Sequence, residues 1–497
     1  MILHSVFQFS NSQHLDRLRE VLQRTDYTET SVRDRLRLDV LGTPGPLDVL
    51  YGMDCTAEMT PLDVLIRLFF LNTGVKTEEG ARVLGSDVVS ASVDAGLFKE
   101  DRGEISCPVF VTPIYGLFLV CDRPDQTRVD QVMTVGTSTK SLASLTVRRH
   151  SKLSLDLGCG GGILTFLAAR HSDHVIGLDV NARAIAMAQF AAQLNGLRNV
   201  EFAVGDWFEP VKDRRFDLIM ANPPYVISPQ NTFQYRDSGC AGDDLCRRLA
   251  GTVPEILAED GFYHMNVNWL VVRGQEWQDR LAGWVRGTGC DTWVLKQELM
   301  APTRYAGAWV GDQADVADRY TQWTEYYKSL GATAIGDGLI TMRKRSTGEN
   351  WFRVDDIPKG DRIAAGDAVR MGFLLRDYLE SAKDDPSLLS ARLRVNVDAR
   401  VHQVYAHAGR QLSPVSAEIA LARGLPYRAG ADPLVIGLLA RCDGSATVSQ
   451  LLAQLADATG AKLEAITPSC LRMLRSLIEH GFLLPESVAQ PSTAAHA

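Results

Sequence analysis

Short apolar runs alternate with amphipathic stretches through the middle of the chain. An amphipathic stretch at 181–196 ends in Asn-Gly and predicts a helix. Further apolar runs at 261–270 and 333–345 predict later strands. Continuous apolar strands separated by helices are typical of a parallel sheet that is covered on both faces. The four short runs that predict its first strands lie at 154–159, 174–180, 200–206 and 216–222.

The pattern changes on either side of this region. Before it, helical runs at 60–75 and 87–98 precede paired strands at 107–122, which are rich in Val and Phe. After it, amphipathic helices are expected at 432–457 and 469–485, the second closing on a glycine and a short strand. Helices followed by short strands indicate a winged-helix-like module at each end of the chain.

A chain of 497 residues exceeds the size of one ordinary core and predicts several domains. We expect an N-terminal winged-helix-like domain with a small strand unit and a central α/β domain. A C-terminal winged-helix-like domain and a disordered tail follow. The expected boundaries are 1–125, 126–345, 346–485 and 486–497.

Composition narrows the class of protein. Hydrophobic content of 45% and charged content of 23% are typical of a soluble globular protein. The first residues lack a basic start and a long apolar run, and no run approaches the roughly 18–20 residues that span a bilayer. We therefore expect a cytoplasmic protein with no membrane partner.

Cysteine usage and net charge exclude further classes. The nine cysteines are scattered and never spaced C-x-x-C, which indicates reduced thiols rather than a disulfide framework or a zinc site, and no metal is expected. The net charge of −8 and the lack of a basic stripe disfavour a protein whose main ligand is the phosphate backbone of a nucleic acid.

A glycine-rich loop, "DLGCGGG", follows the first predicted strand and leads into a helix. Glycine is needed where backbone turns tightly or approaches a ligand. Asp179 ends the next strand, 23 positions after Asp156, which is close to the spacing of a ribose-binding acid in nucleotide folds. A dinucleotide fingerprint counted from Gly158 would place its third glycine at Ile163, so that class fits poorly.

The acid before the first glycine indicates which nucleotide is bound. Asp156 would repel a pyrophosphate but attract the ammonium and sulfonium of S-adenosylmethionine. Asp206 follows the third strand, where its carboxylate can accept a hydrogen bond from an adenine amino group. Three acids at successive strand ends surround one cationic, adenosine-bearing cofactor, although each alone is also typical of a cap or turn.

The fourth strand ends in Asn222, Pro223, Pro224 and Tyr225, which a core strand does not require. The Asn222 oxygen and the Pro223 carbonyl can accept the two N–H groups of a planar nitrogen, and Tyr225 offers a face for a flat group. The competing interpretation is a strand-ending turn, because Asn-Pro and Pro-Pro are turn signals. Trp207 and Phe208 are candidates for the pocket wall or for ordinary packing.

Taken together, the D-x-G-x-G-x-G loop (156–162), Asp179, Asp206 and "NPPY" (222–225) resemble class I S-adenosylmethionine-dependent methyltransferases, over about 126–345. "NPPY" resembles the subgroup that methylates adenine or guanine amino groups or glutamine amides. The stretch at 235–249 is similar to the glutamine-type and small-domain members, and residues 130–146 stand where such enzymes close over the cofactor.

The resemblance implies a Rossmann-like, doubly wound, seven-stranded α/β sheet flanked by the winged-helix-like α+β domains. It implies methyl transfer from S-adenosylmethionine and assigns roles to individual residues. The catalytic residues would be Asn222, Pro223 and Tyr225, with Pro224 and Tyr225 contacting the substrate. The cofactor would be bound by Asp156, Gly158, Gly160, Gly162, Asp179, Asp206 and Asn222.

The acceptor is left open among several classes. The acidic charge and Tyr225 favour a small-molecule, peptide or protein acceptor with a planar nitrogen. A nucleic acid acceptor gripped by the flanking domains is the alternative. A non-catalytic cofactor-binding scaffold and an oxygen nucleophile are further hypotheses.

Overall fold

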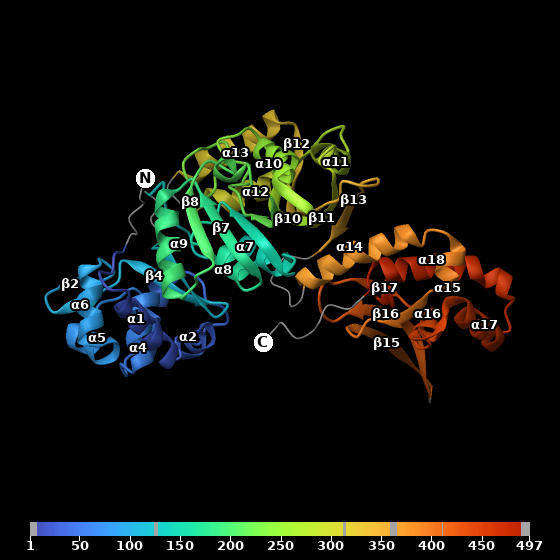
Figure 1. Cartoon of the computed structure of the whole chain (residues 1–497), viewed down its shortest axis with the longest axis horizontal. Coiled ribbons are helices and arrows are strands. Elements are labelled where there is room, and N and C mark those ends of the chain that lie inside the picture. The colour runs from blue at the N-terminus through green and yellow to red at the C-terminus, as the bar shows by residue number, and fades with distance from the viewer. Residues whose placement is uncertain (1–6, 124–127, 312–314, 358–364, 410, 489–497) are drawn as a thin grey trace. The chain divides into compact units, whose positions relative to one another are not determined.

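The structure is a computed structural model that describes residues 7–123, 128–311, 315–357, 365–409 and 411–488 (Figure 1). The chain forms two compact units. Residues 1–142 and 149–356 make up the first, and residues 143–148 and 357–497 make up the second. The helix α7 (Thr137–Leu145) begins in the first unit and ends in the second. The predicted domain boundaries stay predictions.

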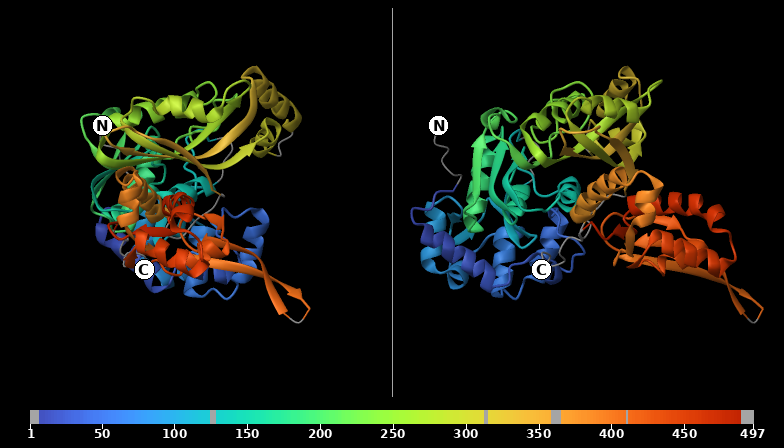
Figure 2. Two further views of the ribbon diagram at one scale, coloured as in Figure 1. Left: turned by 90° about the vertical axis from the view of Figure 1, so that its right-hand side faces the viewer. Right: turned by 45° about the vertical axis from the view of Figure 1, so that its right-hand side comes forward.

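An eight-stranded sheet dominates the first unit (Figures 1 and 2). Seven strands were expected; the eighth, β13, lies beyond the predicted end of the domain and pairs parallel with β11. Its sequence "FRVDD" has only two alternating apolar residues, Phe352 and Val354, which is too short a pattern to predict a strand. In sheet order the strands are β13 (Phe352–Asp356), β11 (Cys290–Met300), β12 (Ala332–Lys344), β10 (Leu257–Val272), β9 (Phe216–Ala221), β6 (Ser151–Leu157), β7 (Ser172–Asp179) and β8 (Val200–Val204).

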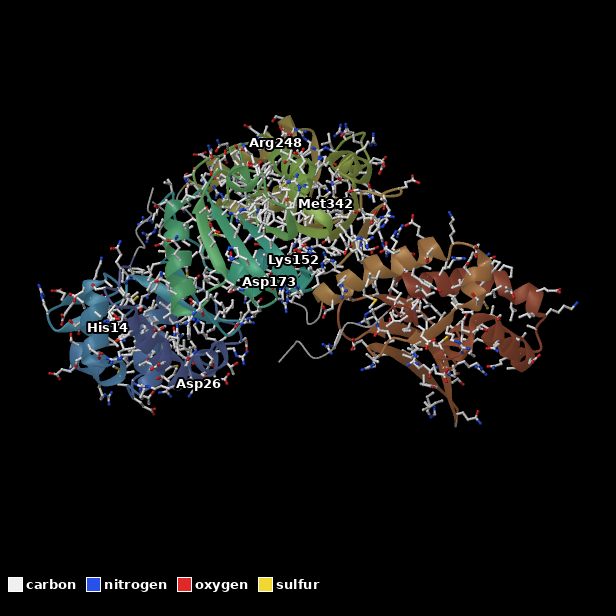
Figure 3. The ribbon with its side chains drawn as sticks, viewed as in Figure 1. His14, Asp26, Lys152, Asp173, Arg248 and Met342 are labelled. Atoms are coloured by element: carbon white, nitrogen blue, oxygen red, sulfur yellow. The ribbon has the colours of Figure 1, made fainter. Side chains whose placement is uncertain are left out.

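The sheet is mostly parallel, which brings the strand ends of the sequence motifs together. β6 pairs parallel with both β7 and β9, and β8 and β10 extend the parallel order on either side. Only β12 runs antiparallel, between β10 and β11. Lys152 and Asp173 mark the amino ends of β6 and β7 (Figure 3). The motif residues therefore gather at the opposite, carboxyl edge.

Helices cover both faces of this sheet, as predicted. On one face, Leu155 and Leu157 share a core with Leu249 of α10 (Asp244–Thr252) and Leu281 of α11 (Trp277–Val285). On the other, α8 (Ile163–Ala169) and α9 (Ala182–Leu194) pack against β7 and β8. The short turns η2 (Glu209–Val211) and η3 (Val253–Ile256) complete the connections.

A helical pair lies between β11 and β12 and has a small core of its own. It consists of α12 (Pro302–Val310) and α13 (Val316–Ser329). Tyr305, Trp323 and Tyr327 from this pair are fully or nearly fully buried and pack around Ile227 and Ile335. The pair thus rests on the segment that follows Asn222.

The N-terminal part of the first unit carries helices, a three-stranded antiparallel sheet and a hairpin, with the predicted paired strands at 107–122 confirmed. Asn195 after α9 exchanges hydrogen bonds of 2.8 Å with the Phe118 backbone. The winged-helix class of this part stays a prediction. Its elements are α1 (Ser12–Arg24), α2 (Glu29–Leu36), α3 (Pro46–Cys55), α4 (Pro61–Leu65), η1 (Ile66–Phe70), β1 (Val75–Lys76), α5 (Thr77–Leu84), α6 (Ser86–Asp94), β2 (Lys99–Asp101), β3 (Glu104–Ser106), β4 (Val109–Ile114) and β5 (Leu117–Asp122).

The second unit combines two three-stranded sheets with helices, and β15 and β16 project as a long hairpin (Figure 2). The helix predicted at 432–457 is two helices, α16 and α17, separated by β18, in which Gly444 takes a φ of 85°. The elements are α14 (Ala365–Ser381), α15 (Asp385–Ser390), β14 (Arg392–Val395), β15 (Ala399–Ala408), β16 (Gln411–Leu421), β17 (Arg428–Gly430), α16 (Pro433–Leu439), β18 (Asp443–Thr447), α17 (Val448–Thr459), α18 (Leu463–Glu479) and β19 (Leu483–Pro485).

The helices, the cysteines and the C-terminal tail bear on three further predictions. Within the described ranges, no helix combines the length and apolar character needed to cross a membrane. All nine cysteines are free thiols, and all but Cys55 and Cys240 are buried. Of the tail predicted to be disordered, residues 489–497 lie outside the described residues.

Candidate cofactor and acceptor site

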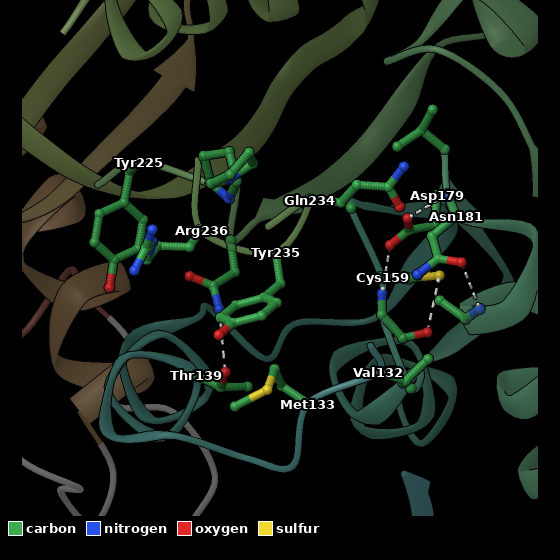
Figure 4. A pocket seen from close by; sticks show the side chains of 18 of the residues that line it. Val132, Met133, Thr139, Cys159, Asp179, Asn181, Tyr225, Gln234, Tyr235 and Arg236 are labelled. Atoms are coloured by element: carbon green, nitrogen blue, oxygen red, sulfur yellow. Dashed lines mark hydrogen bonds between the residues drawn. The ribbon is translucent and has the colours of Figure 1, made fainter. Parts of the chain in front are cut away.

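A cavity of about 570 Å³ lies at the carboxyl ends of β6 to β9 (Figure 4). Its volume is within the roughly 300–1,000 Å³ of small-molecule pockets. The structure brings most of the predicted site residues into its wall. These are Gly158, Gly160, Asp179, Asp206, Asn222, Pro223, Pro224 and Tyr225.

The glycine loop forms the floor of the cavity. Gly158 and Gly160 have φ values of 75° and 53°, a region that other residues rarely adopt. Among the described residues, apart from the two chain neighbours, no atom lies within 4 Å of the place where a Cβ on Gly160 would stand, so a ligand can contact the backbone there. The Gly160 N–H donates to Asp179 Oδ2 over 2.8 Å, which ties the loop to the next strand.

Asp179 organises the loop and faces the cavity. Its Oδ1 accepts from the Asn181 N–H at 2.8 Å, and its Oδ2 accepts from Gly160 (Figure 4). A carboxylate has about four acceptor sites, so Asp179 keeps acceptor capacity for a ligand hydroxyl. Burial raises the pKa of Asp179 above its usual range. The residue fits the ribose-binding role that the sequence predicts.

Asp156 and Gly162 lie behind the cavity wall rather than in it. Asp156 is fully buried, and its Oδ2 accepts from the Thr165 N–H at 2.9 Å and the Thr165 hydroxyl at 2.7 Å. Its Oδ1 has no hydrogen-bond partner among the described residues, and burial raises its pKa to about 7. A Cβ on Gly162 would press on Phe166 at 2.8 Å. Both residues support the loop from behind, and their contact with a ligand stays a prediction.

The end of β8 contributes a second wall. Asp206 and Trp207 line the cavity, and Trp207 adopts a positive φ of 50°. Phe208 is not part of the lining and packs instead against the core between the sheet and α10. Of the two aromatic candidates, only Trp207 therefore contacts the pocket.

A segment before β6, residues 131–139, forms the roof of the cavity. That the longer stretch 130–146 closes over a cofactor stays a prediction. The Asn181 side-chain amide donates to the Asp130 carbonyl at 2.9 Å and holds this segment over the end of β7. The chain then passes into α7, whose first turn also reaches the cavity. The roof residues are Gln131, Val132, Met133, Thr134, Val135, Gly136, Ser138 and Thr139.

The side chain of Asn222 is fixed at both ends. Its Nδ2 donates to Thr139 Oγ1 at 3.1 Å, and its Oδ1 accepts from Asn266 Nδ2 at 2.7 Å (Figure 4 shows the bond to Thr139). The neighbouring Pro223 carbonyl accepts from the Tyr225 N–H at 2.7 Å. Each of the two carbonyl oxygens thus keeps one lone pair for a further donor.

Tyr225 lies between two cores and contributes to the cavity wall. Its hydroxyl bonds with Ser138 in the roof, and burial raises its pKa well above the usual range. The phenol is therefore neutral at physiological pH. Its ring is held in place beside Asn222 as an aromatic surface.

A loop at 228–238 closes the far side of the cavity and is built around one carboxylate. Asp237 Oδ2 accepts from the N–H groups of Thr232 and Phe233 at 2.9 and 3.1 Å. Its Oδ1 pairs with Arg236 at 2.7 Å, and the guanidinium lies 5.7 Å from the ring centre of Trp323. Asn231, Gln234, Tyr235 and Trp309 also line this side.

Three further residues at or beside the cavity, Thr139, Asn266 and Trp309, were not among the predicted site residues. Thr139 lies in the segment expected over the cofactor, but nothing in its sequence singles it out. Asn266 could have been predicted as a functional residue, because "HMNVNWL" places two side-chain amides in an otherwise apolar strand. Trp309 belongs to a helix pair whose position follows from the tertiary structure alone.

The donor set favours an organic ligand over a metal ion. Within the described ranges, no cluster of three or more His, Cys, Asp or Glu side chains could hold a metal. Backbone N–H groups, a free-facing carboxylate and aromatic rings line the cavity instead. The Asp179 carboxylate in the wall and the open face of Gly160 suit a ligand with hydroxyl groups.

Two family descriptions match the chain. Residues 150–272 match a family described as "Methyltransferase domain", and residues 371–485 match a domain of unknown function. The first match spans β6 to β10 and contains the glycine loop, Asp179, Asp206 and "NPPY". This part of the chain is similar to that family of methyltransferase domains.

Three relatives match the same region in part. A release factor glutamine methyltransferase of Geobacter sulfurreducens is 32% identical over 177 residues, 33% of this chain and 59% of the relative. A ribosomal protein uL3 glutamine methyltransferase of Bradyrhizobium diazoefficiens is 36% identical over 120 residues, 22% and 38%. A ribosomal RNA small subunit methyltransferase C of Alcanivorax borkumensis is 32% identical over 129 residues, 25% and 34%. The chain thus covers a third to three fifths of these relatives.

Proposed function

We propose that this protein transfers a methyl group from S-adenosylmethionine to the planar nitrogen of a small-molecule, peptide or protein substrate, with the glutamine amide of a protein as the leading acceptor. The observation that carries the proposal is the place of Asn222. Its amide stands in the wall of the cavity that the glycine loop and Asp179 also line. Two of the three relatives named above are glutamine methyltransferases, which supports this acceptor class.

The cofactor would be held by residues with separate tasks. Asp179 would accept the ribose hydroxyls, and Asp206 would accept the adenine amino group. The Gly158–Gly160 backbone would contact the amino acid part. When bound, S-adenosylmethionine supplies a methyl group on a positively charged sulfur. The roof at 131–139 would exclude water from that group.

The acceptor residues would align and polarise the nitrogen. Its lone pair is delocalised, so the nitrogen must be held while the lone pair turns toward the methyl group. Asn222 Oδ1 and the Pro223 carbonyl would each accept one N–H, and these bonds strengthen as positive charge develops on nitrogen. Proline fixes φ and so aims its own carbonyl. Tyr225 would pack against the flat face of the acceptor, and Pro224 would complete the contact.

A second candidate is methylation of a ribosomal RNA base. The relative named ribosomal RNA small subunit methyltransferase C favours it. The net charge of −8 disfavours it. RNA-binding proteins gain affinity when Lys and Arg side chains neutralise phosphates and release their counterions, and an acidic protein has few such side chains to spare. Strong dependence of substrate binding on salt concentration would support this candidate.

We also infer that the two flanking parts are winged-helix-like and select the acceptor. Each combines helices with small antiparallel sheets, which supports this assignment. The acceptors named for two of the relatives, a release factor and a ribosomal protein, are components of translation and support a cytoplasmic location.

The proposal is tested by calorimetry and a transfer assay with labelled S-adenosylmethionine. Purified bacterial release factor and ribosomal protein uL3 serve as acceptors. We expect Asn222→Ala to bind the cofactor within about threefold of wild type and to lower kcat by about 10²- to 10³-fold, as for the loss of a transition-state hydrogen bond. No binding of S-adenosylmethionine by the wild-type protein would overturn the proposal.

A further inference from the structure

The amide of Asn222 has two orientations that differ little in shape. Rotation by 180° about its last torsion exchanges an oxygen and a nitrogen of similar size. Only one orientation is useful under the proposed function, on which this inference rests. The Asn222 oxygen must face the acceptor. If the Asn222 nitrogen faced it instead, the N–H groups of both amides would point at each other and neither could accept.

Asn266 is placed beside this amide by strand pairing. β10 pairs parallel with β9, and Met265 stands opposite Ala221, the residue before Asn222. Asn266 is 4% exposed, and its neighbours Met265 and Val267 are fully buried. A buried amide in an apolar strand costs free energy unless its groups are hydrogen-bonded. The Asn266 nitrogen meets this requirement through two hydrogen bonds.

The orientation of Asn266 is itself fixed by the backbone. Its Nδ2 donates to the Ser138 carbonyl at 3.0 Å and to Asn222 Oδ1 at 2.7 Å. A backbone carbonyl can only accept, so the Asn266 nitrogen must face Ser138 and Asn222. Thr139 cannot set the orientation alone, because its hydroxyl donates or accepts equally well.

We propose that Asn266 is a positioning residue for methyl transfer, which holds the Asn222 amide with its oxygen available to the acceptor nitrogen. In the reversed orientation, the nitrogens of Asn222 and Asn266 would face each other and one buried donor would lose its partner. The Ser138 carbonyl fixes the orientation of the Asn266 amide, and Asn266 in turn fixes the orientation of the Asn222 amide. Asn266 acts on kcat without touching the cofactor or the acceptor.

The test is a double-mutant cycle of Asn222→Ala and Asn266→Ala, with release factor and uL3 as acceptors. We expect Asn266→Ala alone to lower kcat by about 10- to 100-fold, while the Kd for S-adenosylmethionine stays within about twofold. In the Asn222→Ala background, Asn266→Ala should lower kcat by less than about twofold further, because its target is absent. The isosteric Asn266→Asp should lower kcat at least as much as Asn266→Ala, since a carboxylate accepts from the Asn222 nitrogen and favours the reversed amide.

Asn199→Ala is the matched control. Its side-chain nitrogen also donates to two backbone carbonyls, those of Ala169 and Ser172, each at 2.9 Å. It should lower thermal stability to a similar degree and leave kcat unchanged. Equal losses from Asn266→Ala in both backgrounds, or wild-type kcat in Asn266→Ala, would overturn the inference. Failure of the wild-type protein to methylate either acceptor would instead overturn the proposed function on which it rests.

Discussion

At the scale of single residues, buried polar groups around the cavity divide into two kinds. Asp179 accepts from two backbone N–H groups and still faces the cavity. Asp156 lies one layer deeper, with one oxygen satisfied by Thr165 and the other without a partner among the described residues. Two acids that look alike in the sequence thus have different electrostatic roles. Asp179 presents its carboxylate to the ligand, whereas burial of the Asp156 carboxylate lowers the free energy of unfolding.

We predict that Asp156 makes stability fall as pH rises. Its pKa is about 7 in the folded protein and about 4 when unfolded. The unfolded chain therefore loses its proton first, and the free energy of unfolding decreases between about pH 4 and pH 7 by roughly 2–4 kcal/mol. Asp156→Asn cannot ionise and still accepts from Thr165. Chemical denaturation should show Asp156→Asn gaining stability over wild type from pH 5 to pH 8. A constant difference across that range would contradict the prediction.

At the scale of elements, the helix pair α12–α13 clamps the chain beyond "NPPY". The Tyr327 hydroxyl donates to the Ile227 carbonyl at 2.8 Å. The Tyr305 hydroxyl accepts from the Ile227 N–H at 3.2 Å and donates to Asn268 Oδ1 at 2.6 Å. Both backbone groups of one buried residue are thus satisfied by phenols. The clamp also carries Trp309 to the cavity.

We predict that Tyr305→Phe lowers the free energy of unfolding by about 2 kcal/mol, because it leaves the Ile227 N–H and Asn268 Oδ1 without the hydroxyl. Since Trp309 lies one turn away on the same helix, the KM for the protein acceptor should also rise. Urea denaturation and steady-state kinetics measure the two effects. Tyr320→Phe, at a side chain that is 37% exposed, is the control and should change stability by less than about 0.5 kcal/mol. If Tyr305→Phe and Tyr320→Phe changed the free energy of unfolding equally, the proposed stabilising role of the Tyr305 hydroxyl would be wrong.

The elements that could be predicted from the sequence are those whose signals are local. The strands β6 to β9, the helix α9 and the glycine loop follow from apolar runs and caps within about twenty residues. Asn266 and Trp309 could not be placed, because strand pairing and helix packing bring them to the cavity from distant parts of the chain. β13 was missed because its alternating apolar pattern is only two residues long, Phe352 and Val354. The position of Asp156 behind the wall depends on the packing of α8.

At the scale of the whole molecule, residues 143–148 belong to the second unit although they lie within the sequence of the first. Leu145 and Val147 are buried there. A Cβ on Gly366 of α14 would overlap the Thr146 carbonyl oxygen. The second unit therefore closes tightly around this strip of chain.

We predict that Gly366→Ala destabilises the second unit by about 1–3 kcal/mol, because the backbone must move to admit one methyl group. Helix propensity alone would give the opposite sign, by about 0.8–1 kcal/mol. Gly437→Ala in α16 is the control, since its nearest neighbour is the end of the Arg441 side chain at 3.5 Å, and it should be neutral or stabilising. Thermal unfolding of both variants measures the difference. Stabilisation by Gly366→Ala would contradict the packing.

The course of α7 has a thermodynamic consequence for the chain. Its first turn carries Ser138 and Thr139, which bond Tyr225 and Asn222, and its last residues are enclosed by the second unit. Under the proposed function, an effector that binds the second unit and shifts the first turn of α7 through residues 143–148 would alter the affinity for the methyl donor. Linkage is reciprocal, so the methyl donor would alter the affinity for that effector by the same factor. Ligand binding in the cavity and ligand binding in the second unit would then be coupled through α7.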